Sequence, residues 1–230
     1  MVSDSGMRSI FTRVAGLSRP DRNCSVSKIL DEASRMGVDA RHIISEGFGG
    51  LSSIDPGLID WKGLLPNSHW IVIPSITNEE GVAGLSAWSA SMSFAELEGV
   101  RCALFVESSE DSSGMEKLWG SIVERIRQVH LLFMTPCALN SISNIEGISP
   151  ELLLSEIRRN SLVPLVCSFD PGSGIAQVEH SFGATKTIIG EPTDCERWFA
   201  SFIVGLAQSG SGKVGIDLAA STINSNYHSN

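Results

Sequence analysis

The chain has 230 residues, a net charge of −9 and an isoelectric point near 5.0. This length suits one large α/β domain, or a small N-terminal unit followed by a larger domain. The acidic balance argues against nucleic-acid binding by the whole surface, because affinity for phosphates depends on clustered lysine and arginine. Only 19% of the residues are charged. A weakly charged surface favours self-association or work inside an assembly.

The five cysteines are odd in number, widely spaced and without a C-x-x-C pair. This pattern argues against a disulfide framework or a zinc ribbon, and it favours the reducing environment of the cytoplasm. The first residues contain no long apolar run of the kind found in secretory signals. No segment approaches the roughly 20 apolar residues that a membrane span needs. We therefore expect a cytoplasmic protein with no membrane span.

Residues 1–55 are predicted to form a small helical segment that ends in a glycine-rich linker. Residues 6–17 and 25–36 show helical spacing, and Gly37 suits the end of the second helix. A further helix is predicted from Asp39 to Ser45. Glycines and turn residues then cluster at 47–57, which places a boundary near residue 55.

Residues 29–46 also carry a pattern typical of a helix-turn-helix. Ala33 lies four residues before Gly37, so a small side chain stands where two helices would cross. The second helix would present Asp39 and Arg41 outward. Asp39 would repel phosphates, and few base-reading residues accompany it. An ordinary helical corner explains the same pattern, so DNA binding through residues 25–46 is an alternative and not the main hypothesis.

Short apolar runs separated by amphipathic stretches follow the linker. The runs, which we predict to be strands, lie at residues 69–73, 100–106, 129–134 and 162–168. This alternation is typical of a parallel sheet covered by helices. Two further short strands are predicted within residues 175–189. Residues 56–208 are therefore predicted to form a three-layer, Rossmann-like α/β domain with a mostly parallel sheet of about five strands.

Helix signals occur at several points between and after these strands. Residues 115–126 form the clearest amphipathic helix, and Ser149 followed by Pro150 is a favourable helix start. Thr193 and Glu196 have the spacing of a capping box. We predict a loop over residues 135–148 and a flexible tail over residues 209–230, which is rich in serine, glycine and asparagine.

The loops that leave the strands hold the candidate ligand-binding residues. These residues are Ser75, Thr77, Glu107, Cys137 and Asp170. In a parallel sheet they would converge on one edge. Cys137 has no histidine base close in the pattern, and a metal pair would require the strands before Glu107 and Asp170 to be neighbours. Turn formation explains each residue equally well, so we assign no catalytic residue, metal or cofactor.

Two other features of the sequence bear on nucleotide binding and on partner binding. The GSGKVG stretch at residues 210–215 matches G-x-G-x-x-G but follows a predicted helix instead of a strand, so it is not a nucleotide-binding signature. Trp61 and Trp70 flank a short apolar segment. Exposed together, they would form an apolar patch, and they are our candidate partner-binding residues.

The sequence thus favours a non-catalytic interaction or scaffold protein of a larger cytoplasmic assembly, with protein partners or self-association. This hypothesis leans against an enzyme, because no catalytic spacing is present. One alternative is an enzyme or small-molecule-binding protein that uses the loops at the C-terminal ends of the strands. The other is a DNA-associated regulator that uses the weak helix-turn-helix at residues 29–46.

Overall fold

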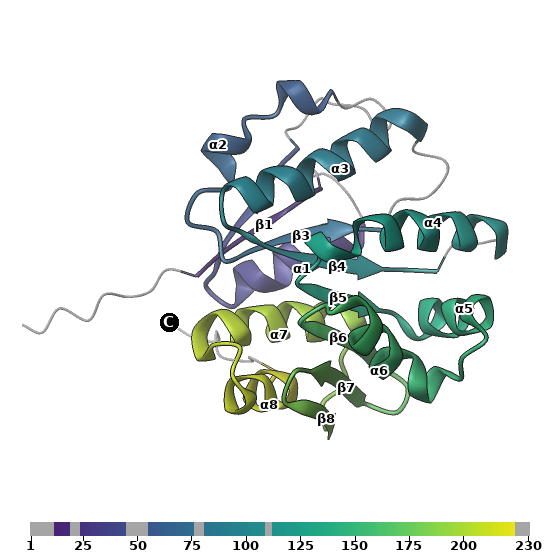
Figure 1. The fold of residues 1–230 in the computed structure, drawn as a ribbon. Coiled ribbons are helices and arrows are strands. Elements are labelled where there is room, and N and C mark those ends of the chain that lie inside the picture. The colour runs from purple at the N-terminus through teal and green to yellow at the C-terminus, as the bar shows by residue number, and fades with distance from the viewer. Residues whose placement is uncertain (1–11, 19–23, 45–54, 76–80, 109–111, 224–230) are drawn as a thin grey trace, which may run out of the picture.

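A single sheet of eight strands organises the molecule (Figure 1). The computed structural model describes residues 12–18, 24–44, 55–75, 81–108 and 112–223. Along the sheet the strands run in the order β2-β1-β3-β4-β5-β6-β7-β8. Strands β1 to β6 are parallel, and β7 and β8 are antiparallel to their neighbours. The prediction of an α/β fold with a mostly parallel sheet is confirmed, whereas the prediction of about five strands is wrong.

The strands are short, and most are apolar. Their bounds are β1 Arg13–Gly16, β2 Asp39–His42, β3 Trp70–Pro74, β4 Arg101–Val106, β5 Leu131–Met134, β6 Leu165–Asp170, β7 Ile175–His180 and β8 Gly183–Ile188. Strands β3 to β6 are almost entirely buried, as expected of a parallel sheet covered on both faces. Strand β8 is an edge strand with one exposed face, and Thr185 and Thr187 on its other face are half-buried.

Helices cover the two faces of the sheet. Their bounds are α1 Ser25–Arg35, α2 Trp61–Leu64, α3 Gly81–Leu97, α4 Ser112–Arg125, α5 Pro136–Glu146, α6 Pro150–Ser161, α7 Cys195–Ser209 and α8 Lys213–Ser221, with short 3₁₀ turns η2 Pro56–Leu58 and η4 Ile126–Gln128. One core lies between the sheet and α2 to α6. The other lies between the sheet and α1, α7 and α8.

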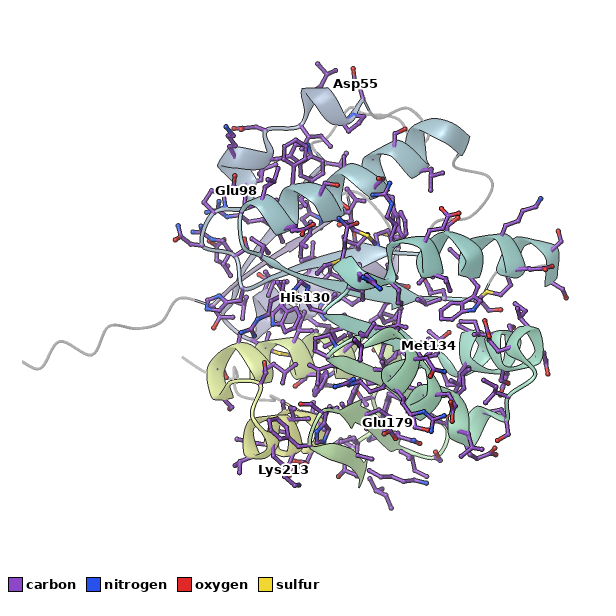
Figure 2. All side chains as sticks on the ribbon, viewed as in Figure 1. Asp55, Glu98, His130, Met134, Glu179 and Lys213 are labelled. Atoms are coloured by element: carbon purple, nitrogen blue, oxygen red, sulfur yellow. The ribbon has the colours of Figure 1, made fainter. Side chains whose placement is uncertain are left out.

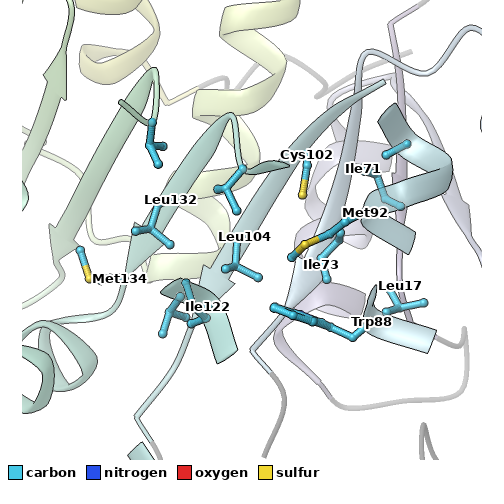
Figure 3. Packing of buried hydrophobic residues seen from close by; sticks show 14 of the residues in the cluster. Leu17, Ile71, Ile73, Trp88, Met92, Cys102, Leu104, Ile122, Leu132 and Met134 are labelled. Carbon is cyan, nitrogen blue, oxygen red and sulfur yellow. The ribbon is translucent and has the colours of Figure 1, made fainter. Parts of the chain in front are cut away.

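Alternation along each strand divides its side chains between these two cores. Figure 3 shows Ile71 and Ile73 of β3 beside Trp88 and Met92 of α3. The intervening Val72 belongs to the core on the other face. Because successive side chains of a strand point to opposite faces of the sheet, each buried strand supplies apolar groups to both helical layers.

Aromatic rings dominate the core beneath α7. Phe133 of β5 lies 4.7 Å from Phe105 of β4 and 5.1 Å from Phe199 of α7, measured between ring centroids. Trp198 of α7 stacks on Phe169 of β6 at 5.5 Å. These contacts fix α7 across the middle strands, which determines where the first turn of α7 lies.

The N-terminal segment differs from its prediction. Residues 13–16 form β1 instead of the end of a helix, and residues 39–42 form β2 instead of a second helix. The rest of the predicted 6–17 helix lies outside the described residues. The helix-turn-helix at residues 29–46 therefore lacks its reading helix. The segment expected to stand before the α/β domain contributes two strands to that domain's sheet.

Helices extend further than predicted in the second half of the chain. The expected loop over residues 135–148 contains α5, whose N-cap Thr135 accepts a hydrogen bond from the Ala138 N–H. The segment expected to be a flexible tail contains α8. Helix α6 begins as predicted, at Pro150 after the N-cap Ser149. The N-cap of α7 is Asp194, one residue after the predicted Thr193.

Trp61 and Trp70 do not form an exposed patch. Both are buried: Trp61 stacks on Phe94 with 5.2 Å between ring centroids, and the Arg101 guanidinium lies over the Trp70 ring. The expectation that the two side chains are exposed is wrong, because Trp61 belongs to one core and Trp70 to the other, whereas partner binding through them stays a prediction. Within the described ranges, no helix combines the length and apolar character needed to cross a membrane.

Candidate functional site

The order of the strands indicates which edge of the sheet is most favourable for a ligand-binding site. From β1 the chain proceeds to β2 on one side, whereas from β3 it proceeds to β4, β5 and β6 on the other. Beyond the carboxyl ends of parallel strands, such a reversal creates a crevice where α/β proteins bind ligands. Figure 2 labels His130 and Met134, which mark the beginning and the end of β5. The carboxyl ends of the parallel strands lie at the edge that Met134 marks.

Four polar side chains meet at this edge. The Ser25 Oγ donates to Glu107 Oε1 at 2.6 Å, and it lies 3.3 Å from Glu196 Oε1. The Lys28 Nζ is 3.4 Å from the same Glu196 oxygen. One serine hydroxyl thus bridges two carboxylates, and an ammonium group lies beside one of them. We call these four residues the strand-end cluster.

Three different elements position the strand-end cluster. Glu107 directly follows β4, and its backbone N–H donates to the Ser75 Oγ after β3 at 3.1 Å. Ser25 is the first residue of α1, and Glu196 lies in the first turn of α7. The two helices lie side by side on one face of the sheet. The structure therefore brings together two residues of the predicted site, Ser75 and Glu107.

The charges of the strand-end cluster are partly shielded from solvent. Ser25 is buried, the Glu196 side chain is 16% exposed and the Lys28 side chain is 50% exposed. A carboxylate in the first turn of a helix interacts favourably with the helix dipole, which favours a glutamate at position 196. The cluster can accept hydrogen bonds from ligand hydroxyl groups through its carboxylates and can attract a phosphate through Lys28.

The two helix N-termini at this edge differ. Asp194 caps α7, and its carboxylate accepts a hydrogen bond from the Arg197 N–H at 2.8 Å. The N-cap of α1 is Cys24, which makes no side-chain capping bond. An anion at the start of α7 would have to compete with Asp194, whereas the first amides of α1 are not capped by a side chain.

The other predicted site residues do not join the strand-end cluster. The Asp170 carboxylate accepts hydrogen bonds from the Ser173 hydroxyl and the Gly172 N–H, and these bonds lower the pKa of Asp170. Strand β5 separates β4 from β6, so Glu107 and Asp170 do not follow neighbouring strands. Cys137 is exposed in the first turn of α5. Thr77 lies outside the described residues.

No part of the chain that the structure describes groups three or more histidine, cysteine, aspartate or glutamate side chains in a way that could hold a metal ion. The glycine-rich stretch at residues 210–215 runs from the end of α7 into the first turn of α8, so no strand precedes it. A Cβ on Gly215 would lie 2.3 Å from the Gly210 carbonyl oxygen, so the close turn between the two helices requires glycine there. Lys213 pairs with Asp217 at 2.9 Å.

Sequence reasoning missed Ser25, Lys28 and Glu196. Ser25 lies 82 positions before Glu107 and 171 positions before Glu196, so no local spacing reveals their contact. Glu196 did carry a signal, because it was recognised as part of a helix start. The sequence prediction placed ligand-binding residues only after strands. The N-termini of α1 and α7 lie at the same edge of the sheet and supply the residues that were missed.

No protein-family model matches the chain, and no curated protein matches it in sequence. Solved structures do match in fold. A PfkB protein from Polaromonas sp. JS666 aligns with a TM-score of 0.70 and 10% identity over 91% of this chain and 93% of that one. A 2-dehydro-3-deoxygluconokinase from Thermotoga maritima gives 0.65 and 12% identity, covering 91% of both chains. A fructokinase from Vibrio cholerae O395 bound to fructose, ADP and calcium gives 0.65 and 12% identity, covering 92% of this chain and 90% of that one.

The chain therefore has the α/β fold of the PfkB-type kinases, with a mostly parallel sheet and helices on both faces. The similarity extends over about nine-tenths of the chain. It contradicts the prediction of a non-catalytic scaffold or interaction protein, because the solved structures that share this architecture include carbohydrate kinases. The finding agrees better with the alternative of an enzyme or small-molecule-binding protein that uses the strand-end loops.

Proposed function

We propose that this protein transfers a phosphoryl group from a nucleoside triphosphate to a hydroxyl group of a small polyhydroxylated molecule. The observation that carries the proposal is the bridge from Ser25 to Glu107 and Glu196 at the carboxyl edge of the parallel strands. The similarity in fold to kinases of sugars and sugar acids supports the same class of substrate. The sequence identity of 6–12% carries no residue-level assignment, so the roles below come from the geometry.

Each member of the strand-end cluster suits one part of this reaction. A carboxylate can accept the proton of the attacking hydroxyl group while that oxygen bonds to the phosphorus and the nucleoside diphosphate leaves. Glu196 suits the role of base, since its side chain is largely shielded from solvent. Lys28 can stabilise negative charge on the transferred group. Ser25 orients the two carboxylates through its hydroxyl group.

The strand-end cluster suits a divalent cation only if the phosphate oxygens of the nucleoside triphosphate supply further ligands. Mg²⁺ is commonly held by one or two carboxylates together with phosphate oxygens and water. Glu107 and Glu196 are carboxylates of this kind, and the phosphates would supply the remaining oxygen ligands. Bound in this way, the cation would neutralise charge on the phosphates.

A direct test measures ADP release from Mg–ATP in the presence of a panel of sugars, sugar acids and polyols. Glu196→Gln should lower the rate by about 100-fold or more if Glu196 is the base, and Glu107→Gln should weaken substrate binding. Glu191→Gln is the matched control, since Glu191 is exposed in the loop before α7 and should leave the rate unchanged. Absence of ADP release that depends on a polyol would reject the proposed reaction.

A second candidate function is binding of the same class of molecule without transfer. Asp194 favours this candidate, because its carboxylate already occupies the start of α7, where a phosphate would otherwise bind. Calorimetry would then show binding of a polyol that Glu107→Gln weakens, with no ADP formed from Mg–ATP. Asp194→Asn should in that case leave polyol binding unchanged.

Location in the cytoplasm and association with protein partners or further copies of the chain stay predictions. The cytoplasm is favoured by the cysteine content, and self-association by the weakly charged surface. Cell fractionation checks the first prediction. Light scattering of the purified protein checks the second, since an oligomer gives a mass that is a multiple of 24.6 kDa.

A further inference from the structure

A cavity of about 260 Å³ lies between α4, α5 and α6, on the face of the sheet away from α1 and α7. Its walls are largely apolar and include Trp119, Val123, Ile126 and Ile157. Two acidic residues, Glu146 and Glu156, also line it. Nothing in the proposed reaction uses these residues.

The cavity is at the opposite edge of the sheet from the strand-end cluster. It shares Ile126, Asn160 and Ser161 with a neighbouring cavity of about 520 Å³, which extends to His130. His130 immediately precedes β5, whereas Met134 ends this strand near the strand-end cluster (Figure 2). A ligand in this cavity would therefore bind at a second, separate site.

The charges around the smaller cavity have one sign. Its charged lining residues are both glutamates, and no lysine or arginine is among its lining residues. The Trp119 Nε1 donates a hydrogen bond to Glu146 Oε1, which holds this carboxylate beside the indole. Glu156 pairs with Arg159, whose side chain is 72% exposed. An indole with an adjacent carboxylate is an arrangement that attracts organic cations.

We propose that this cavity binds a small amphipathic amine, consisting of an aromatic or branched apolar group that carries an ammonium group. The apolar walls would take the hydrocarbon part, and Glu146 with the Trp119 ring would take the cation. The volume suits a ligand of about ten heavy atoms, smaller than a drug-sized molecule. The net charge of −9 also favours the approach of a cation over that of an anion.

The proposal is tested with 2-phenylethylamine, and 2-phenylethanol serves as the uncharged analogue. The Trp119 indole N–H is a local reporter in ¹H–¹⁵N spectra, because it donates to Glu146. Addition of the amine should shift this signal in a saturable manner, and the alcohol should bind more weakly by about fivefold or more. Equal binding of both compounds, or no shift with the amine, would overturn the proposal.

Two pairs of variants separate this cavity from the rest of the surface. Glu146→Gln keeps an acceptor for Trp119 but removes the charge, so it should weaken amine binding by about fivefold. Glu124→Gln, on α4 but not among the residues that line the cavity, should leave amine binding unchanged. Val123→Trp should fill the cavity and abolish binding. Val214→Trp, at an exposed valine on α8, should leave binding intact.

Glu196→Gln separates this proposal from the proposed reaction, since it should abolish phosphoryl transfer and leave the shift of the Trp119 signal unchanged. Retained amine binding in both Glu146→Gln and Val123→Trp would overturn the proposed site, whatever the outcome of the ADP-release assay.

Discussion

The stacked pair of Phe105 and Phe133 should contribute a measurable coupling energy to the stability of the fold. Both rings are fully buried, and their centroids are 4.7 Å apart with an angle of 12° between the planes. Phe133 makes ring contacts with Phe105, Trp198 and Phe199, whereas Phe105 makes them with Phe133 and Phe199. Replacement of either ring with leucine keeps most of the apolar volume but removes these contacts.

The expected magnitudes follow from the number of ring contacts. An aromatic pair contributes about 0.5–1.5 kcal/mol beyond its buried area. Phe133→Leu should therefore lower the free energy of unfolding by about 2–3 kcal/mol, and Phe105→Leu by about 1–2 kcal/mol. In the double variant the losses should fall short of additivity by about 0.5–1.5 kcal/mol, since both single variants remove the same pair.

Urea unfolding monitored by circular dichroism measures these free energies. Phe182→Leu is the matched control, because Phe182 is 56% exposed in the turn between β7 and β8, and the change should cost less than about 0.5 kcal/mol. A coupling energy below about 0.3 kcal/mol would refute the reasoning, because independent sites add within that margin. The result also bears on the site, since Glu107 is two residues after Phe105.

Three further predictions concern single residues. Gly205→Ala should destabilise the protein by about 1–2 kcal/mol in urea unfolding, because its Cβ would lie 2.9 Å from the Ala219 Cβ where α7 meets α8. Gly120→Ala, whose Cβ meets nothing within 4 Å, should instead stabilise α4 by up to about 1 kcal/mol. Equal effects of the two substitutions would contradict the packing argument. Burial lowers the pKa of His180 below 6.5. The contribution of the neutral His180 to stability should therefore be fully present above pH 6.5 and decline as the pH falls through the lowered pKa. The urea midpoints at pH 7.5 and 5.5 should differ less in His180→Gln than in the natural protein. Cys137, the one exposed cysteine among the described residues, should react first with a thiol reagent, and Cys137→Ser should remove that fast phase. A fast phase that survives the substitution would show that another thiol, such as that of the half-buried Cys24, reacts as quickly.

The middle of the sheet was predictable because its strands are continuous apolar runs. Strands β3 to β6 are buried on both faces, so almost every residue in them is apolar and the runs stand out from the flanking helices. Strands β1 and β2 have only four residues each. In β2, Asp39 and Arg41 pair with each other at the edge of the sheet, so its pattern shows no apolar run at all.

Local helix signals were present where the prediction failed. Thr135 followed by Pro136 is the same kind of start as Ser149 followed by Pro150, yet only the second was interpreted as a helix. The site was half predictable for a related reason. Glu107 and Ser75 follow strands and were found, whereas Ser25 reaches the same edge from the start of a helix. Its contacts depend on how α1 and α7 pack, which no local pattern encodes.

The contact between α1 and α7 has a consequence for biosynthesis. Glu196 leaves the ribosome 171 positions after Ser25, and α7 must dock on the sheet before the two side chains can meet. Until then α1 lacks the helix beside it, and its apolar face stays open to solvent or to chaperones. A chain that is interrupted before α7 would hold most of its parallel sheet and none of the completed cluster. The ligand binding that we propose at this edge would therefore require α7 to be docked on the sheet.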